Sequence, residues 1–155
     1  MRYNVTVKVI FLDVDGVLNG RKTFVGPDDN GRLSLDPGMC DQLKRIVDSC
    51  WPNTPIVVLS STWRLFPASK EAVTRWLSDR GIEIHSQTDD LGHVLRGEEI
   101  NKWFADRPHI TRNFIILDDG SDFTEEQKPF LIQTSFDDGL TPEKADNAIR
   151  ILKEL

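Results

Sequence analysis

The sequence predicts an α/β fold, a three-layer Rossmann-like architecture in which a parallel sheet of about five strands carries helices on both faces. Two observations lead to this prediction. Short apolar runs typical of buried strands alternate with amphipathic stretches typical of helices, and this alternation is characteristic of parallel sheets. In addition, 39% of the 155 residues are hydrophobic and 28% are charged, which is typical of a folded globular domain.

The predicted strands are the apolar runs. The first alternates polar and apolar residues and then becomes continuously apolar, as expected for a strand that begins half exposed and ends buried on both faces. The last is expected at an edge of the sheet because Pro129 precedes it. The five strands are predicted at residues 5–13, 56–59, 82–84, 114–117 and 130–132.

The predicted helices carry start and stop signals. Asp36 and Thr141 each precede a proline, the pattern of an N-cap followed by proline at the first helical position. A helix over residues 68–80 is expected to stop at Gly81, and a further helix is expected to end before Pro108.

The chain shows no repeat and no linker, so a single domain over residues 1–155 is expected, with a small flap at about 17–35. The net charge of −6 argues against a broad basic surface for nucleic acid. No apolar run approaches the roughly 20 residues of a membrane helix, and the N-terminus lacks the pattern of a secretion signal. We therefore expect a cytoplasmic protein with no membrane contact, in which Cys40 and Cys50 are free thiols.

Polar residues follow three of the predicted strands at the point where the apolar run stops. Asp13-Val14-Asp15-Gly16 follows the first strand, Ser60-Ser61 the second and Asp118-Asp119 the fourth. In an open parallel sheet, ligands bind beyond the carboxyl ends of the strands. The three groups are therefore expected to converge on one site.

Several carboxylates at one site repel one another unless a cation is present. Mg²⁺ binds through one or two carboxylates and bridges to phosphate oxygens. Phosphoryl transfer needs such a metal together with an in-line nucleophile. The acidic residues therefore indicate Mg²⁺ as the cofactor and a phosphorylated substrate.

These motifs resemble those of the haloacid dehalogenase (HAD) superfamily. Residues 13–19 (DVDGVLN) resemble its first motif, Ser60 its second and Asp118-Asp119 its fourth. Narrower matches resemble a small branch that includes the HAD domains of bacterial multi-domain RNA-repair proteins. These are LSSTWR at 59–64, RGEEI at 96–100, LDD at 117–119 and GLT at 139–141.

The resemblance implies a HAD-like fold and assigns catalytic roles. Asp13 would attack phosphorus and form an aspartyl-phosphate. Asp15 would protonate the leaving oxygen and then activate water. Mg²⁺ would be held by the Asp13 carboxylate, the Asp15 backbone carbonyl and the acidic pair, with Asp119 favoured for direct ligation and Asp118 for a contact through water.

Other site residues are expected to bind the substrate. The resemblance implies that the Ser60 hydroxyl and nearby backbone N–H groups hold the phosphoryl oxygens. Gly16 and Ser61 are further candidates for binding the substrate. Arg64 is expected either to reach a substrate phosphate or to pair on the surface. Trp63 is expected either to stack on a base or to belong to the core.

The third motif of the superfamily is usually a lysine, and this sequence departs from that pattern. Lys102 lies within a predicted helix, and Lys128 comes after the fourth strand. Arg96, just before the helix that leads to the fourth strand, is better placed, and its guanidinium can neutralise a phosphoryl group with bidentate geometry. Arg96 is therefore the candidate for this role, with a solvated loop arginine as the alternative.

The predicted function is Mg²⁺-dependent hydrolysis of a phosphomonoester through an aspartyl-phosphate. The segments between the motifs are too short for a folded cap, so an open site is expected. An open site suits large substrates such as nucleic-acid ends or phosphoproteins, and the resemblance to the HAD domains of RNA-repair proteins favours a nucleotide or a nucleic-acid end. The alternatives are a phosphatase of another small metabolite or a phosphoprotein, a non-catalytic HAD-like binding domain, and a receiver-type phosphoacceptor.

Overall fold

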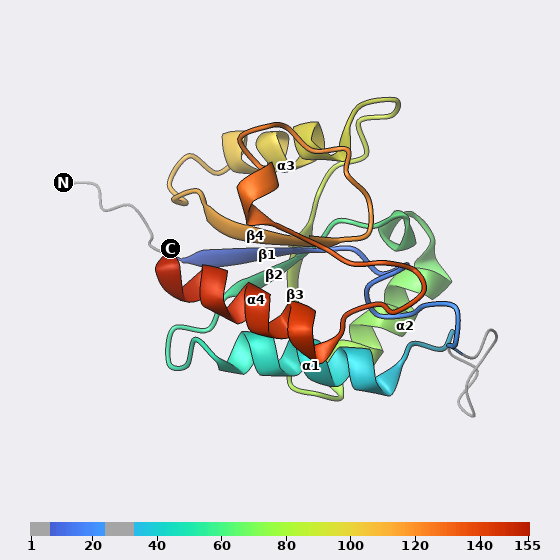
Figure 1. The fold of residues 1–155 in the computed structure, drawn as a ribbon. Helices are drawn as coiled ribbons and strands as arrows, with labels where there is room; N and C mark the ends of the chain where they lie inside the picture. The colour runs from blue at the N-terminus through green and yellow to red at the C-terminus, as the bar shows by residue number, and fades with distance from the viewer. Residues whose placement is uncertain (1–6, 24–32) are drawn as a thin grey trace.

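The computed structural model describes residues 7–23 and 33–155. Its centre is a five-stranded parallel sheet with the strand order β3-β2-β1-β4-β5 (Figure 1). The strands are β1 (Lys8–Leu12), β2 (Ile56–Leu59), β3 (Ile84–Gln87), β4 (Asn113–Asp118) and β5 (Leu131–Gln133). The last strand lies at an edge, as predicted from Pro129.

The described residues form four α-helices and two short 3-10 helices, of which all but α4 lie between strands in the chain. Two of the α-helices begin at the predicted caps: the side chain of Asp36 accepts a hydrogen bond from the backbone N–H of Met39, and that of Thr141 from the N–H of Lys144. The α-helices are α1 (Pro37–Asp48), α2 (Pro67–Ser78), α3 (Arg96–Ala105) and α4 (Pro142–Glu154), and the 3-10 helices are η1 (Thr62–Leu65) and η2 (Lys128–Phe130).

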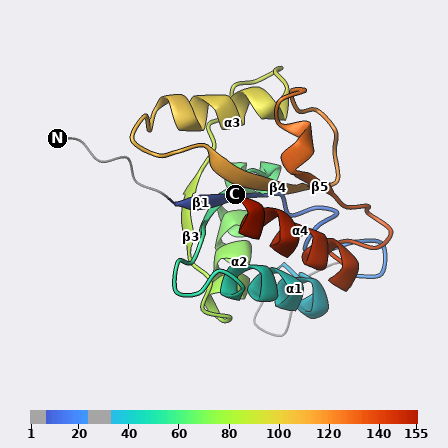
Figure 2. The same cartoon turned by 60° about the vertical axis from the view of Figure 1, so that its left-hand side comes forward.

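The helices cover both faces of the sheet, and this confirms the three-layer prediction. Helices α1, α2 and α4 lie on one face and α3 on the other (Figures 1 and 2). Alternate residues of β1 divide between the two cores. Ile10 and Leu12 pack with α1, α2 and α4, whereas Val9 and Phe11 pack with α3. Burial on both faces explains why the predicted strands read as continuous apolar runs.

The third strand was predicted at 82–84, and this position is wrong, because β3 runs from Ile84 to Gln87. Ile82 is buried and its N–H donates to the carbonyl of Leu77 at the end of α2. Ile82 therefore fills the core before the strand begins. The strand lies at an edge of the sheet, paired with β2. Because three of its four residues are polar, a search for apolar runs does not find it.

Parts of two predictions fall on residues outside those described. The first strand was predicted over 5–13, and the described part begins at residue 7. The flap expected at about 17–35 includes residues 24–32, which the structure does not describe. Between Ser60 and Asp118 the chain forms η1, α2, β3 and α3, and this segment contains no separate cap unit.

Two further findings concern cysteines and membrane segments. Cys40 is buried and Cys50 half-buried, and both are free thiols, as expected. None of the helices in the part of the chain that is described has the length and apolar character needed to cross a membrane.

The sheet register brings three chemically important residues side by side. Leu12 of β1 pairs with Leu59 of β2 and with Leu117 of β4. The residues that follow these three leucines are Asp13, Ser60 and Asp118. The chain runs outward from β1 to β3 and then returns to β4 on the other side of β1. This reversal of strand order is the place where ligands bind in open α/β sheets.

Candidate active site

The backbone fixes the first residues of the site as an extension of the sheet. The N–H of Asp13 donates to the carbonyl of Leu117 at 2.9 Å, and the N–H of Ser60 donates to the carbonyl of Leu12 at 2.8 Å. These hydrogen bonds continue the ladders of β1 with β4 and with β2. Asp13 and Ser60 are therefore held by rigid strands and not by mobile loops.

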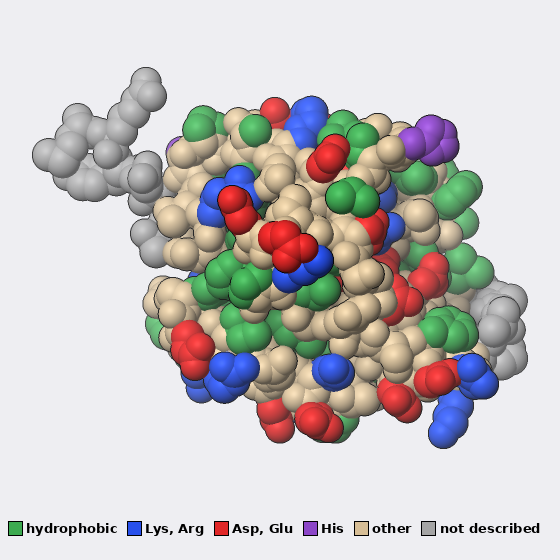
Figure 3. All heavy atoms as spheres, turned by 45° about the horizontal axis from the view of Figure 1, so that its top comes forward, with side chains coloured by type: hydrophobic (Ala, Val, Ile, Leu, Met, Phe, Trp, Pro, Cys, Tyr) green, Lys and Arg blue, Asp and Glu red, His purple; other side chains and the backbone are tan. Residues whose placement is uncertain are grey.

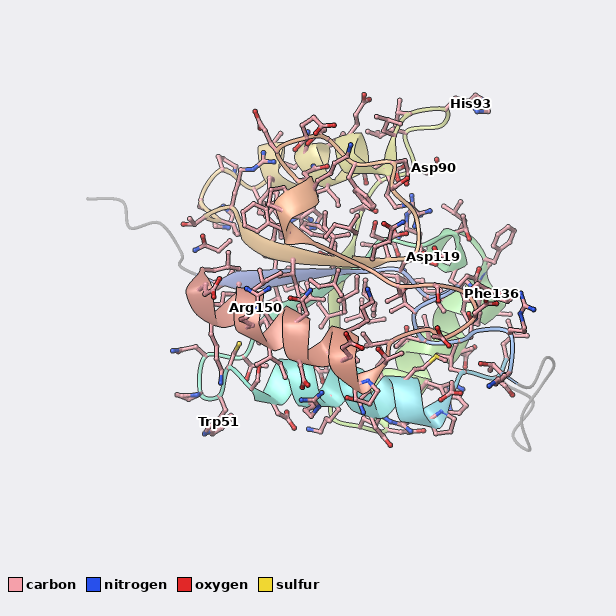
Figure 4. All side chains as sticks on the ribbon, in the orientation of Figure 1. Trp51, Asp90, His93, Asp119, Phe136 and Arg150 are labelled. Atoms are coloured by element: carbon pink, nitrogen blue, oxygen red, sulfur yellow. The ribbon has the colours of Figure 1, made fainter. Side chains whose placement is uncertain are left out.

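Three carboxylates converge at this edge. Oxygens of Asp13, Asp118 and Asp119 lie within 4.8 Å of one another, and Figure 4 places Asp119 beyond the ends of β1 and β4. Asp13 and Asp118 are buried, whereas Asp119 is half-buried. The cluster that the sequence predicted at the strand ends is thus present.

Burial and mutual repulsion disfavour the charged forms of these acids. The pKa of Asp13 is raised from 3.8 to about 8, first by burial and then by the neighbouring Asp118. The pKa of Asp118 is also raised, mainly by burial. A divalent cation would reverse this balance, because it stabilises ionised carboxylates.

Arg96 provides a cation inside the site. Its Nη1 lies 3.3 Å from Oδ1 of Asp13 and 3.4 Å from Oδ2 of Asp118, and it donates to the Ser60 carbonyl at 2.6 Å. Burial would lower the pKa of Arg96, but the carboxylates of Asp13 and Asp118 more than offset this effect and raise it. Arg96 is the first residue of α3, whereas the sequence placed it just before this helix.

The two lysines considered for the same role lie in other contacts. Lys102 pairs with Asp89 at 2.8 Å and with Asp106 at 2.6 Å. Lys128 pairs with Glu125 at 2.6 Å. Of the three basic residues weighed from the sequence, Arg96 is the one that the structure places against the acidic cluster.

The serine pair divides into two environments. Ser60 is buried, and its Oγ has no hydrogen-bond partner in the described part of the chain. An unpaired buried hydroxyl costs free energy unless a ligand satisfies it. Ser61 is also buried, but its Oγ accepts from the N–H of Trp63 and caps η1.

Gly16 lets the first loop approach the acidic cluster. It has a φ of +78°, and an added Cβ would lie 2.6 Å from Cγ of Asp119. Its carbonyl accepts a hydrogen bond from Thr134 Oγ1 at 2.5 Å. Only glycine combines this backbone conformation with so close an approach.

Asp15 lies at the solvent side of the site. Its side chain is exposed, and Oδ1 accepts hydrogen bonds from Asn19 Nδ2 and from Trp63 Nε1, both at 2.9 Å. Trp63 also packs against the core that contains α1, α2 and α4. The sequence suggested the core contact but not the hydrogen bond to Asp15, because the two residues are far apart in the chain.

Arg64 occupies an environment that neither sequence alternative described. It is buried, and it donates to the carbonyls of Thr88 and Ser61 at 2.9 and 2.6 Å and to Oε2 of Glu99 at 3.2 Å. The side chain thus ties η1 to the segment after β3 and to α3. Its predicted contact with a substrate phosphate stays a prediction. Glu99 was not singled out from the sequence, because an acid in the first turn of a helix is normally explained by its favourable interaction with the helix dipole.

A family model described as the HAD domain in Swiss Army Knife RNA repair proteins matches residues 9–145. The chain belongs to this HAD family. The match includes the three strand ends and Arg96, and so covers the whole site described above. A search of the curated proteins found no match for this HAD domain.

Proposed function

We propose that this HAD domain is a Mg²⁺-dependent phosphomonoester hydrolase that acts through an aspartyl-phosphate on Asp13. The observation that carries the proposal is the cluster of Asp13, Asp118 and Asp119 beside Arg96, at the switch point of the sheet. Membership of a HAD family supports hydrolase chemistry.

The residues present fit a magnesium ion. Three carboxylates within 4.8 Å form an all-oxygen donor set, which is the set that Mg²⁺ prefers. Asp118 already accepts from the N–H of Gly120 at 2.8 Å and contacts Arg96, whereas the carboxylate of Asp119 has no hydrogen bond to another described residue. This difference favours Asp119 as the direct ligand, with Asp13 and the Asp15 carbonyl. The bound ion would neutralise the carboxylates and the phosphoryl oxygens.

Asp13 is proposed as the nucleophile. Its Oδ1 is held by the N–H of Val14 at 2.8 Å and by Arg96, which leaves Oδ2 as the attacking atom. In the first step an Oδ2–P bond forms and the ester P–O bond breaks, while the departing oxygen takes a proton from Asp15. Ser60 Oγ, which has no hydrogen-bond partner in residues 7–23 and 33–155, donates to a phosphoryl oxygen.

The second step releases phosphate. Asp15, now ionised, takes a proton from a water molecule that attacks phosphorus, and the Oδ2–P bond breaks. Asp13 returns as a carboxylate and inorganic phosphate leaves. Arg96 stabilises the negative charge in both steps, because it contacts the carboxylate of Asp13, which carries the phosphoryl group in the intermediate.

A nucleotide or a nucleic-acid end is the proposed substrate. The segment between Ser60 and Asp118 contributes no cap, and this supports a substrate that is the end of a large molecule. The matching family is described from RNA repair proteins. On the face shown in Figure 3, Lys and Arg side chains are scattered among acidic ones, which favours binding of a terminal phosphate over many contacts along a polynucleotide.

The test is a substrate panel assayed with Mg²⁺ and with EDTA. The panel contains 5′- and 3′-mononucleotides, phosphorylated DNA and RNA ends, sugar phosphates, phosphopeptides and p-nitrophenyl phosphate. Asp13→Asn should abolish turnover, because an amide is a poor nucleophile, while Asp48→Asn on the exposed side of α1 serves as the matched control. Turnover by Asp13→Asn at the wild-type rate would refute the mechanism. Metal binding without any turnover would instead support a non-catalytic HAD-like binding domain.

A further inference from the structure

Two side chains outside the expected catalytic set act on Asp15. The indole Nε1 of Trp63 and the amide Nδ2 of Asn19 both donate to Oδ1 of Asp15 at 2.9 Å. The donors come from different elements, since Asn19 belongs to the turn after β1 and Trp63 to η1 after β2. Among residues 7–23 and 33–155, no hydrogen bond reaches the other oxygen of Asp15, Oδ2.

Each donor is itself held in place. Asn19 Oδ1 accepts from the N–H of Gly16 at 2.9 Å, so its amide group is oriented from both ends. The backbone N–H of Trp63 donates to Ser61 Oγ at 3.2 Å, and the neighbouring Arg64 is tied to the Ser61 carbonyl. An exposed carboxylate would otherwise sample several rotamers.

We infer that Trp63 and Asn19 are positioning residues that fix the acid–base group of the reaction. They occupy Oδ1 of Asp15, so that Oδ2 is the oxygen that gives its proton to the leaving group and later takes one from water. This inference rests on the proposed function. It gives Trp63 a role that neither base stacking nor core packing requires.

The structure offers a matched control in Trp76. Both Trp63 and Trp76 are half-buried and pack against the same core, and the indole of Trp76 also donates one hydrogen bond, to the carbonyl of Leu33 at 3.1 Å. Trp76 lies in α2 and has no contact with Asp15. Replacing either tryptophan by phenylalanine removes one N–H and part of one aromatic ring, but only Trp63→Phe removes a hydrogen bond to Asp15.

The experiment compares leaving groups that need protonation to different degrees. kcat/KM, which reports only the steps through phosphoryl transfer, is measured for p-nitrophenyl phosphate, phenyl phosphate and a nucleoside monophosphate. The nucleoside monophosphate is an alkyl ester, and its leaving group depends most on protonation. Loss of a hydrogen bond that orients the acid should therefore lower kcat/KM about 10-fold for this alkyl ester and about 2-fold or less for p-nitrophenyl phosphate. Trp63→Phe should show this graded loss, and Trp76→Phe should show no gradation.

Asn19→Asp provides a second variant that does not disturb the core. The aspartate keeps an acceptor for the Gly16 N–H but replaces the donor to Asp15 with an oxygen. The same graded loss is expected, and this variant decides the question if Trp63→Phe does not fold. Thermal unfolding of every variant identifies a loss that arises only from stability.

Each outcome separates the two proposals. An equal loss for all three esters, no loss, or faster turnover of the alkyl ester by Trp63→Phe would overturn the positioning role while the phosphatase assignment stands. If the wild-type protein hydrolyses none of the esters in the presence of Mg²⁺, the proposed function fails and the positioning role fails with it.

Discussion

Removing the carboxylate of Asp13 should change how the stability of the metal-free HAD domain depends on pH. In the folded chain, burial and the nearby Asp118 raise the pKa of Asp13 from 3.8 to about 8. Between these two values the folded chain binds more protons than the unfolded chain, and stability therefore falls as pH rises. The stabilisation of the protonated form is fully present below the unfolded pKa and is lost as pH rises toward 8.

The structure sets the size of this effect. A difference of one bound proton changes the free energy of unfolding by about 1.4 kcal/mol per pH unit. Between about pH 5 and pH 7, Asp13 alone should lower the stability of the wild-type protein by about 3 kcal/mol. Asp13→Asn removes the contribution of Asp13. Stability should still fall with pH, but less steeply, because the pKa of Asp118 is raised as well.

The assay is urea unfolding in EDTA across this pH interval, followed by tryptophan fluorescence. Asp48→Asn is the control, since Asp48 is exposed and pairs with Lys44 of the same helix. Addition of Mg²⁺ should stabilise the wild-type protein most at the upper end of the interval, because the ion binds the ionised acids of the folded state. Parallel curves for the wild type and Asp13→Asn, or stability that rises with pH in EDTA, would refute the argument.

Two further predictions concern the arginines. Arg64→Met should lower the free energy of unfolding, measured in urea, by about 3–5 kcal/mol, because it leaves the carboxylate of Glu99 buried without its cation. The double variant Arg64→Met/Glu99→Gln should recover part of this stability. A raised KM with unchanged stability would contradict this and favour a substrate contact. Arg96→Ala should lower kcat/KM about 100-fold. Arg96→Lys should recover only part of this loss, since an ammonium lacks the planar fork of donors with which a guanidinium can hold two phosphoryl oxygens. Wild-type kcat/KM in Arg96→Ala would exclude Arg96 from the reaction.

The part of the site that sequence reasoning located is the part formed by strand ends. Asp13, Ser60 and Asp118 each follow an apolar run, and parallel strands end at the same edge, so their convergence needs no knowledge of loops. Arg96 could be selected because the helix before β4 must begin near that edge. The same reasoning misplaced β3, because an edge strand does not need to be apolar throughout. The buried Ile82, which comes before the strand, was predicted as part of it.

The sequence by itself determined the layered α/β architecture, the capped helices and the acids at the ends of the strands, because these follow from periodicity and from neighbours in the chain. Only the tertiary structure decided which contacts the other side chains of the site make. It showed Arg64 buried against Glu99, Ser60 Oγ without a hydrogen-bond partner among the described residues, and the indole of Trp63 hydrogen-bonded to Asp15. Such contacts join residues from different elements, and their formation depends on how the connecting turns place each side chain. No local pattern in the chain encodes that placement.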